Sequence, residues 1–501
     1  MDPRSAAVGV VGAGLGLGVA ELAAGVLPDG RSPLVAVAEL VIRNVPGGVE
    51  RWAIETFGRN DKAVLVVGAV VVVLLLGALT GALARRPLAA LTVAGLTVAV
   101  GCLASLRRLD STVLDLVPPL VGGGAAIVTM LGLLRLGAGR PAGPLSPDAM
   151  GRRTLLVAGS AVAVAAPFAG WAGQRLQRRV DAAASRAKAS LPAAARPAPP
   201  LPAGADLRLD GLSPFITPNA DFYRIDTALL VPQVTAEDWT LRIHGMVDRE
   251  VTFTYDELLA RPLVEADVTL ACVSNEVGGS LVGNARWLGV PLRELLEEAG
   301  VHDDADQVVG RSVDDFTVGF PTAAVFDGRD ALVAVGMNGE PLPVRHGFPA
   351  RLVVAGLYGY VSATKWLKEI ELTRFDRYDA YWIRLDWAPP APIKVQSRID
   401  TPGNRAGAGR VAVAGVAWAQ GRGIDAVEVR IDGGPWRRAE LADEVGPATW
   451  RQWHLPWTAT EGRHVLEVRA TAGDGEVQTG ELAEPFPSGA TGWHRRVVRV
   501  V

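Results

Sequence analysis

The sequence predicts a multi-domain protein with three parts: an N-terminal transmembrane α-helical region, an α+β domain and a C-terminal Ig-like β-sandwich. Three observations support this prediction. Long apolar runs fill the first 175 of the 501 residues, short β-rich runs alternate with helical stretches from about residue 206, and helical patterns stop near residue 390. We therefore expect a membrane region at 1–175, a linker at 176–205, the α+β domain at 206–385 and the sandwich at 386–501.

Five segments of the first part are apolar and long enough to cross a bilayer, which requires about 20 residues. A further stretch at 33–57 contains five charged residues, so we expect it to lie at the interface or re-enter the membrane, the alternative being a sixth crossing. The five expected crossings are Ala6–Leu27, Lys62–Ala84, Pro87–Leu106, Val113–Leu134 and Leu155–Gly173.

The basic residues predict the orientation of these helices. Five crossings place Arg4, Arg85–Arg86 and the loop that ends at Arg152–Arg153 in the cytoplasm, whereas Arg107–Arg108 lies on the other side. The stretch GRRTLLVAGSAVAVAAPFAG also resembles a twin-arginine signal, which exports folded cargo, the alternative being an ordinary basic flank. We expect a multi-pass protein of the cell membrane with its C-terminal two thirds on the extracytoplasmic side.

The segments after the membrane region differ in composition. Residues 176–205 end in LPAAARPAPPLPAG, an Ala- and Pro-rich pattern that is typical of an extended linker. Eleven of the 13 tryptophans follow, between Trp239 and Trp493. Beyond residue 390, runs such as RVAVAGVAWA and RHVLEVRATAGDG alternate apolar and polar residues between turn signals, as strands of a β-sandwich do.

Composition excludes several classes of protein. A formal net charge of −3 gives no reason to expect nucleic acid as a partner. Two cysteines, Cys102 and Cys272, exclude a disulfide scaffold and a Cys-rich metal cluster. All six histidines follow residue 243, so a haem held by two histidines between the membrane helices lacks its ligands, and we expect no haem.

Cys272 lies in the stretch TLACVSNEVGG, far from the other cysteine. It could be an inert core residue, a nucleophile, a redox thiol or a metal ligand. A nucleophile needs a base such as His244 or His346, and a redox thiol needs a resolving cysteine. No cluster of metal-binding side chains surrounds it, but one thiolate can be the only protein ligand of a metal that arrives with an organic ligand of its own.

Such a ligand requires donors for phosphate and polar groups for a heterocycle, and four motifs supply them. Arginine and lysine bind phosphate through charge and directed donors, and serine and threonine add hydroxyls. The motifs are NADFYRID with Arg224, GNARW with Asn284 and Arg286, RHGFPARLVV with His346 and Arg351, and YGYVSATKWLKEIEL with Ser362, Thr364 and Lys365.

Two longer segments carry a family resemblance. TLACVSNEVGGSLVGNARWLGVPLRELL and MNGEPLPVRHGFPARLVVAGLYGYVSATKWLKEIEL resemble the sulfite oxidase family of molybdenum-cofactor enzymes, over about residues 206–500. The whole arrangement is similar to membrane-anchored actinobacterial members. The resemblance implies an oxidoreductase with one molybdopterin, without a nucleotide, and a sandwich of the kind that the family uses for dimerisation.

The resemblance also assigns residues. It makes Cys272 the thiolate ligand of molybdenum, beside the two dithiolene sulfurs of the pterin, and it makes Cys272 and Arg224 the catalytic residues. Tyr223 and Arg224 match the segment that contacts the pterin and shapes the oxyanion pocket, and Thr364 and Lys365 match the phosphate site. The full cofactor-binding set is Asn219, Tyr223, Arg224, Cys272, Asn275, His346, Arg351, Thr364 and Lys365.

The sequence departs from the sulfite-handling members at three positions. Val277 stands where they carry an arginine, Phe316 stands where they carry a tyrosine, and a Pro/Ser/Gly stretch before GWHRR replaces an arginine of the dimerisation domain. Each lost charged hydrogen bond to a dianion costs about 1.5–3 kcal/mol. Sulfite is therefore a poor candidate substrate.

These observations predict oxygen-atom transfer to or from a small substrate. The alternatives are an S- or N-oxide or methionine sulfoxide reductase of the same family, and a non-catalytic membrane sensor or binding module that keeps the fold. Since the chain carries no haem domain, we expect a separate electron-transfer partner, a cytochrome or a quinone-linked protein. Membrane lipid and a second copy of the chain, through the C-terminal domain, are the other expected partners.

Overall fold

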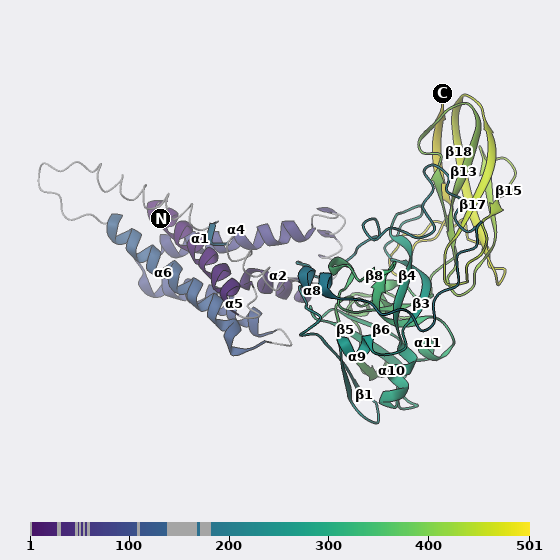
Figure 1. The fold of residues 1–501 in the computed structure, drawn as a ribbon. Helices are drawn as coiled ribbons and strands as arrows, with labels where there is room; N and C mark the ends of the chain where they lie inside the picture. Colours follow the sequence, from purple (N-terminus) through teal and green to yellow (C-terminus); the bar gives the residue numbers. More distant parts are fainter. Residues whose placement is uncertain are drawn as a thin grey trace, which may run out of the picture. The chain divides into compact units, whose positions relative to one another are not determined.

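The computed structural model describes residues 3–27, 32–45, 61–107, 111–137 and 182–501, together with residues 168–170 and a few residues between 49 and 57. The chain divides into two compact units, Met1–Val180 and Asp181–Val501. Figure 1 shows that the first unit is helical, whereas the second consists mostly of sheets. The fold class expected from the sequence is thus confirmed: an apolar helical region, an α+β part and a C-terminal β-sheet region.

Four stretches of the first unit are long and apolar enough to cross a membrane. They coincide with four of the five segments expected to cross, and the fifth, Leu155–Gly173, lies outside the described residues except for 168–170. The 33–57 stretch begins with a helix of 12 residues, α2 (Pro33–Asn44), too short to cross. The long helices are α1 (Pro3–Val26), α4 (Asp61–Ala82), α5 (Pro87–Leu106) and α6 (Val117–Gly137), the last preceded by the 3₁₀ turn η2 (Val113–Leu116).

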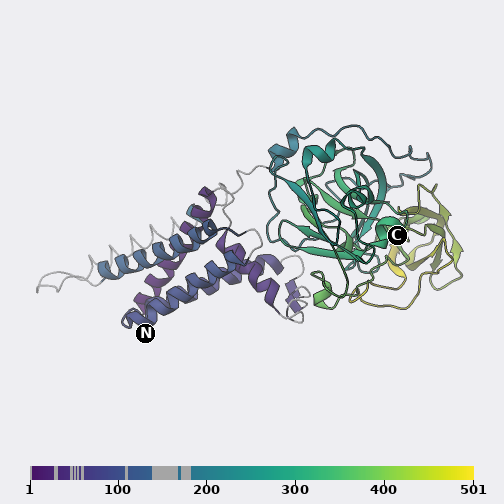
Figure 2. The same cartoon turned by 90° about the horizontal axis from the view of Figure 1, so that it is seen from below.

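Glycines allow α1 to pack closely on its neighbours, which Figure 2 shows from below. A Cβ placed on Gly9 would meet the carbonyl of Gly77 in α4, and one placed on Gly16 would lie 2.7 Å from the carbonyl oxygen of Gly122 in α6. Small residues at such contacts let helix backbones approach, which is how helices associate in an apolar medium. The absence of side chains at Gly9 and Gly16 thus allows α1 to pack against α4 and α6.

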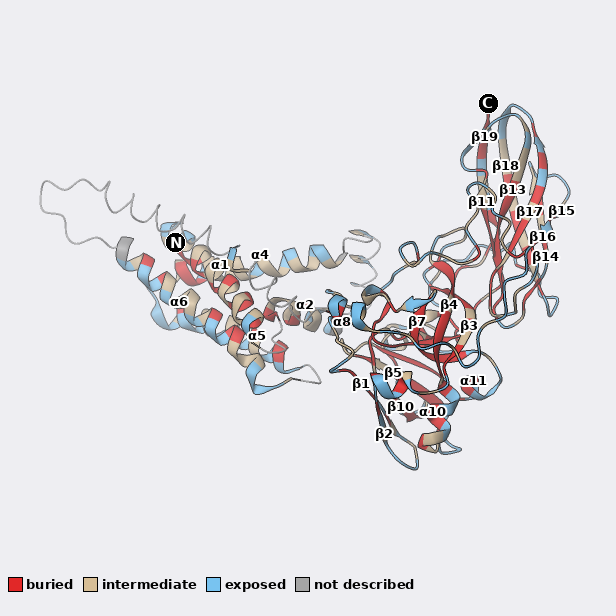
Figure 3. Ribbon diagram, viewed as in Figure 1, coloured by how far each residue is buried: buried red, intermediate tan, exposed pale blue. Residues whose placement is uncertain are grey.

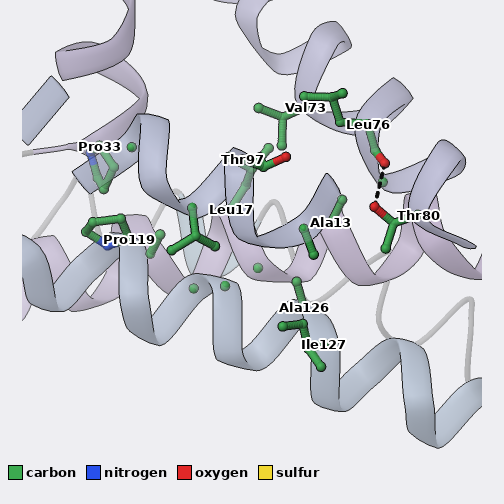
Figure 4. A pocket seen from close by; sticks show the side chains of 18 of the residues that line it. Ala13, Leu17, Pro33, Val73, Leu76, Thr80, Thr97, Pro119, Ala126 and Ile127 are labelled. Atoms are coloured by element: carbon green, nitrogen blue, oxygen red, sulfur yellow. Dashed lines mark hydrogen bonds between the residues drawn. The ribbon is translucent and has the colours of Figure 1, made fainter. Parts of the chain in front are cut away.

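An apolar pocket lies between the helices of this bundle (Figure 4). Its wall includes Leu17, Ile127 and two threonines, Thr80 and Thr97. The Thr80 hydroxyl donates to the Leu76 carbonyl of its own helix at 2.8 Å. The Thr97 hydroxyl of α5 donates to the Val93 carbonyl, one turn earlier, at 2.9 Å. Because these hydroxyls are satisfied locally, the helices present few unpaired polar groups, as an apolar environment requires.

The α+β part of the second unit contains two five-stranded sheets. In the first, with the order β2-β1-β10-β5-β6, β1 and β10 are parallel and the other pairs are antiparallel. Its strands are β1 (Thr240–Gly245), β2 (Val251–Thr254), β5 (Gln307–Ser312), β6 (Thr317–Pro321) and β10 (Leu367–Thr373). The second has the order β3-β4-β7-β8 with β9 also on β7, and consists of β3 (Val264–Ala271), β4 (Val282–Pro291), β7 (Ala331–Met337), β8 (Glu340–Pro341) and β9 (Arg351–Val354).

Buried residues concentrate in these sheets (Figure 3). All seven residues of β7 are buried, as the apolar run ALVAVGM predicts for a strand covered on both faces. Gly300 ends α10 (Leu292–Ala299), the longest described helix of the second unit, at φ +73°, a conformation that favours glycine. The short helices are α8 (Ala182–Lys188), α9 (Tyr255–Leu259), α10 (Leu292–Ala299), α11 (Ala323–Phe326) and α12 (Gly359–Ser362), with 3₁₀ turns η3 (Val344–His346) and η4 (Ile383–Leu385).

The C-terminal part is built from two sheets that pack on a shared apolar core. Trp453, Leu466 and Val498 are buried in this core, and the intervening residues of each strand face outward, as the alternating pattern predicts. One sheet, β11-β13-β17-β16, contains β11 (Gln396–Thr401), β13 (Gly409–Trp418), β16 (Glu440–Leu441) and β17 (Arg451–Ala459). The other, β12-β19-β18-β14-β15, contains β12 (Arg405–Ala406), β14 (Ile424–Ile431), β15 (Arg437–Arg438), β18 (Gly462–Ala472) and β19 (His494–Val500).

Hydrogen bonds join the C-terminal part to strand β3. The Thr269 hydroxyl accepts from the Trp450 backbone N–H at 2.7 Å, and the Gln420 side chain donates to the Thr269 carbonyl at 3.1 Å. The Arg398 guanidinium donates to the Gly279 carbonyl at 2.8 Å, on the loop that follows the same strand. The C-terminal part therefore fixes the position of β3 and of the loop that follows it, in addition to forming its own apolar core.

The close packing of α1 and α4 can be tested with Gly77→Val. A Cβ at Gly77 would lie 2.4 Å from the Ala13 Cβ and 2.7 Å from the Gly9 carbonyl oxygen, so we expect overpacking to cost about 1–3 kcal/mol and to lower the thermal midpoint of the helical unit in detergent. Gly68→Val, in the same helix with no atom within 4 Å, is the matched control and should leave the midpoint unchanged. Equal midpoints for the two variants would contradict the packing described here.

Candidate active site

Cys272 follows β3 directly and begins the loop that leads to β4. The Cys272 backbone N–H donates to the Leu281 carbonyl at 2.9 Å, and the Asn275 side-chain oxygen accepts from the Leu281 backbone N–H at 2.7 Å. Since both ends of the loop are tied together, the thiol has a fixed position at the end of β3, the edge strand of its sheet.

The thiol faces a pocket with an empty volume of about 860 Å³, part of which is open to solvent. Burial raises the pKa of the Cys272 thiol, while hydrogen bonds from the backbone and side chain of Ser274 act in the opposite direction. The Ser274 hydrogen bonds are donors suited to a thiolate. The pocket is lined by Phe222, Tyr223, Ile225, Asp226, Thr227, Cys272, Val273, Ser274, Ser312, Asp314, Phe316, His346, Arg351, Gly359, Tyr360, Ala363, Lys365, Trp366, Trp382 and Trp387.

A buried cation lies on the pocket wall. The Arg351 side chain is 5% exposed and donates to the carbonyl of His346 at 3.1 Å and to that of Leu352 at 3.4 Å, while its guanidinium lies 4.9 Å from the Trp287 ring centre. Burial lowers the pKa of Arg351 to about 10, with Tyr223 opposing, so the group stays positive at neutral pH. Within the described part of the chain it forms no ion pair with a carboxylate, and an anionic ligand would supply the missing negative charge.

His346 stands beside this arginine. Its Nε2 lies 3.1 Å from the Asn219 carbonyl oxygen, which can only accept, so the neutral imidazole carries its proton on Nε2. Burial lowers the pKa of His346 to about 4, and the positive charge of Arg351 acts in the same direction. The neutral ring contacts Phe222 edge-on at 5.8 Å, which keeps it packed against the pocket wall.

Asp226 holds the two other cations of this region. Its carboxylate forms an ion pair with the Lys365 ammonium and another with Arg224 Nε at 2.7 Å. The Lys365 ammonium also donates to the Ile225 carbonyl at 2.7 Å. Lys365 lines the pocket, whereas Arg224 is not among the lining residues and its side chain is 43% exposed.

The structure thus brings five predicted site residues to one pocket: Tyr223, Cys272, His346, Arg351 and Lys365. Burial raises the pKa of the Tyr223 phenol, and negative charge on the thiol acts in the same direction. The phenol is therefore a neutral hydrogen-bond donor at the thiol's side of the pocket.

The other predicted residues make contacts elsewhere. The Asn219 side chain donates to the Met337 carbonyl at 3.2 Å and to Glu340 at 2.5 Å, Asn275 closes the cysteine loop, and the Thr364 hydroxyl donates to the Gly310 carbonyl at 3.3 Å. These three support the walls without lining the pocket. Their roles toward a cofactor, like that of Arg224, stay predictions.

Three further residues of the sequence motifs have structural partners. Buried Asn284 accepts from the Thr269 hydroxyl at 2.9 Å, and Arg286 forms a two-point ion pair with Asp267 at 2.9 and 2.7 Å. The Ser362 hydroxyl is buried and donates to the Tyr358 carbonyl at 3.0 Å. These three side chains are thus engaged by protein groups in the described structure, and their role as ligand donors stays a prediction.

Sequence reasoning missed several lining residues. Asp226, Asp314, Tyr360, Trp382 and Trp387 lie outside the residues that the motifs singled out. The closely spaced tryptophans after β10 were the one available signal. Phe316, noted as a departure from the family pattern, does line the pocket.

The pocket fits a metal that brings its own organic ligand. No group of three or more His, Cys, Asp or Glu side chains in the described residues could hold a bare metal ion. One buried thiol and one buried arginine without a carboxylate partner in the described residues line the same pocket, and a metal with an anionic organic ligand requires such donors.

Comparisons with known proteins agree with this chemistry. A family model, the oxidoreductase molybdopterin binding domain, matches residues 228–382. The mitochondrial sulfite oxidase of Rattus norvegicus is 29% identical over 341 residues, which cover 57% of this chain and 62% of that protein. The chain thus spans less than two thirds of the length of this relative.

Two further matches extend the comparison. The Bacillus subtilis protein named uncharacterized oxidoreductase YuiH is 34% identical over 146 residues, 29% of this chain and 70% of that protein. The sulfane dehydrogenase SoxCD from Paracoccus pantotrophus has a crystal structure that matches with a TM-score of 0.50 at 24% identity, over 59% of this chain and 85% of that one. This last match shows a shared fold.

The fold, the thiol pocket and these matches define a molybdopterin-binding oxidoreductase. Within that class, the chain belongs to the sulfite oxidase family. Its molybdopterin-binding domain implies a molybdenum–pterin cofactor.

Two buried histidines make the stability of the second unit depend on pH. His494 Nδ1 accepts from the Ile399 backbone N–H at 2.9 Å, and burial, with Arg496 and Arg398, lowers the pKa of His494 to about 4, as burial does for His346. Below about pH 6.5 the unfolded chain binds protons that the folded one excludes, so stability falls as the pH drops toward 4. Each histidine can contribute up to about 3 kcal/mol to this loss.

His494→Asn keeps an acceptor near the Ile399 N–H but does not titrate. We expect the thermal midpoint of this variant to fall less steeply than that of the wild type between pH 6.5 and 4.5. His302→Asn changes an exposed imidazole and should reproduce the wild-type profile. Parallel profiles for wild type and His494→Asn would contradict the burial of a neutral ring.

Proposed function

We propose that this protein is a membrane-anchored molybdenum oxidoreductase that transfers an oxygen atom to or from a small substrate. The observation that carries the proposal is the juxtaposition of a buried thiol, Cys272, and a buried cation without a carboxylate partner, Arg351, on the wall of one pocket. The thiolate is the protein's ligand to molybdenum. One pterin without a nucleotide completes the cofactor, and no haem is expected.

The side chains of the pocket have distinct tasks. Arg351 and Lys365 hold the anionic part of the pterin by charge and directed hydrogen bonds. Neutral His346 and Tyr223 offer hydrogen bonds without adding charge, and Cys272 fixes the metal. When bound, the cofactor supplies two-electron redox chemistry and the capacity to exchange an oxygen atom, while the chain supplies ligation, orientation and exclusion of water.

The anchor and the partners follow from the sequence. Four apolar helices long enough to span a membrane support a multi-pass protein of the cell membrane, of the membrane-anchored actinobacterial type that the sequence resembles, with the second unit on the extracytoplasmic side. Electrons reach or leave the site through a separate cytochrome or quinone-linked protein. A homodimer through the C-terminal part is also part of the proposal.

The alternative function is that of a membrane sensor or binding module, which keeps the fold but does not catalyse a reaction. The two differ in molybdenum content and redox activity. We expect about one molybdenum atom per chain by elemental analysis and a change in the optical spectrum on reduction by dithionite. If the protein purified from a cofactor-producing host contains no molybdenum, the proposal is overturned.

Cys272→Ser tests the thiolate. A hydroxyl is a harder and more weakly acidic ligand, so we expect turnover to fall at least about 100-fold while the thermal midpoint changes by less than about 2 °C. Cys102→Ser, at the other thiol of the chain, is the matched control and should keep full activity. Wild-type turnover by Cys272→Ser would refute the assignment.

Arg351→Ala and Lys365→Ala test the anion site. Each removes a positive donor from a bound anion, so we expect the molybdenum-to-protein ratio to fall about tenfold in each variant. Arg293→Ala makes the same change in charge on the exposed face of α10 and should leave the ratio as in the wild type. Unchanged ratios in all three variants would rule out the phosphate role.

Replacing Arg152–Arg153 by lysines tests the export route. The charge is kept, so the topology bias persists, but a twin-arginine receptor that recognises guanidinium geometry rejects the pair. Protease added to intact spheroplasts should remove residues beyond about 180 from the wild type and spare them in the double variant. Equal cleavage of the wild type and the double variant would mean that the arginine pair only contributes positive charge to the membrane topology. Protection of both proteins would place the second unit in the cytoplasm.

A further inference from the structure

One face of the C-terminal part carries a row of arginines. Strands β18 and β19 are antiparallel neighbours (Figure 3), and their register places Arg463 directly opposite Arg499. On the other side of β19, the parallel strand β12 places Arg405 beside the same Arg499. Residues paired in this way point to the same face of a sheet, so three guanidinium groups follow one another across three strands, over about 10 Å at the usual strand spacing.

The row continues along β19. Arg495 lies on the same face as Arg499, four residues earlier, and Val497 lies between them with 38% of its surface exposed. Arg463, Arg495 and Arg499 line a groove with an empty volume of about 1270 Å³, part of which is open solvent. We call the four exposed residues Arg405, Arg463, Arg495 and Arg499 the arginine strip.

The other arginines on this face of the sheet have carboxylate partners, whereas the arginine strip has none. Arg430 pairs with Glu467 at 2.5 Å, and Arg469 pairs with Glu428 at 2.8 Å. Arg495 stands opposite Glu467 in the register, but that carboxylate is the one that Arg430 holds. No ion pair within the described ranges neutralises a member of the strip. Positive charge is thus concentrated in one narrow band, bordered by balanced pairs.

This arrangement is unfavourable for folding. Like charges directly opposite each other on neighbouring strands are destabilising, and Arg499 has a like charge on both sides. Arg463 interacts with Asp432 at longer range, but that carboxylate already lies 2.7 Å from His464 Nδ1 and accepts from the Val465 backbone N–H at 2.8 Å. An anion bound between the arginines would replace their mutual repulsion by attraction.

We propose that the arginine strip is a docking site for an acidic protein, which lays an extended, carboxylate-rich segment along the groove. Guanidinium groups hold carboxylates through paired hydrogen bonds, and a band only three strands wide fits a single extended chain. An anionic membrane is a plane of charge, and the balanced pairs beside the strip offer such a plane no further cations. The strip shares no residue with the thiol pocket, and this inference does not rest on the proposed function.

A second copy of the chain fits the strip less well than an acidic protein does. In a dimer with two-fold symmetry the same surface patch of each subunit meets the other, so a contact centred on the strip would bring arginines against arginines. Such like-charge contacts oppose association. The homodimer proposed above would therefore use another face of the C-terminal part.

A labelled acidic peptide tests the docking site. The probe is a fluorescein-labelled octapeptide in which glutamate and threonine alternate, so that its carboxylates lie on one side of an extended chain at a spacing of about 7 Å. With the full chain in non-ionic detergent, we expect fluorescence anisotropy to show saturable binding that weakens about tenfold between about 50 and about 300 mM sodium chloride.

Paired variants locate the binding. Arg463→Gln/Arg499→Gln should weaken peptide binding at least about tenfold, because two charged hydrogen-bond donors are lost. Arg410→Gln/Arg437→Gln removes two exposed arginines from strands outside the strip, so it is the matched control and should bind as the wild type does. Equal binding by the wild type and Arg463→Gln/Arg499→Gln would overturn the inference.

The thermal midpoint distinguishes a docking site from a structural role. Since Arg463→Gln/Arg499→Gln removes like charges that face each other, we expect its midpoint to rise by about 1–3 °C while binding is lost. A lower midpoint would mean that the arginines stabilise the fold, and would overturn the inference. Two further results would also overturn it: displacement of the peptide by dihexanoyl phosphatidylglycerol at lower concentrations than by unlabelled peptide, which would assign the strip to lipid, and loss of a dimer by the double variant in sedimentation, which would assign it to a second copy.

Discussion

The position of the thiol depends on a buried hydrogen-bond network around Thr269 on strand β3. Its hydroxyl accepts from the Trp450 backbone and donates to Asn284, whose amide in turn donates to the Phe215 carbonyl at 3.0 Å. The Trp450 indole donates to the same carbonyl at 2.9 Å. Every donor in this network has a partner, and breaking one bond leaves a buried polar group unpaired at a cost of about 1–3 kcal/mol. Three distant segments of the chain are thereby fixed three residues before Cys272.

This network explains why the C-terminal part belongs to the same unit as the α+β part. Trp450 and Gln420 reach β3 from the C-terminal sheets, and Arg398 holds the loop that follows Cys272. A pocket that must hold a large cofactor cannot rely on its own walls alone, since a filled cavity provides little packing before the cofactor binds. The C-terminal part supplies that support from outside the pocket.

The sequence predicted the larger features because each has a local signature. Apolar runs of about 20 residues predict membrane helices, and alternating apolar and polar residues predict strands. An isolated cysteine between a β-branched run and two glycines indicated the candidate active site. The roles of single polar residues were harder to predict. Asn284, Arg286 and Ser362 lie in the same motifs as the lining residues, and only the strand pairing shows that their partners are protein groups. Asp314, Tyr360 and the pair Trp382 and Trp387 were missed because the fold brings their separate segments together at one pocket, and only the close spacing of the two tryptophans is visible in the sequence.

The central claim is that one protein sulfur, that of Cys272, completes a centre with a single pterin. X-ray absorption at the molybdenum edge counts sulfur neighbours directly. Two dithiolene sulfurs and the Cys272 sulfur should give three in the wild type and two in Cys272→Ser. Two sulfur neighbours in both proteins, or four in the wild type, would contradict the account.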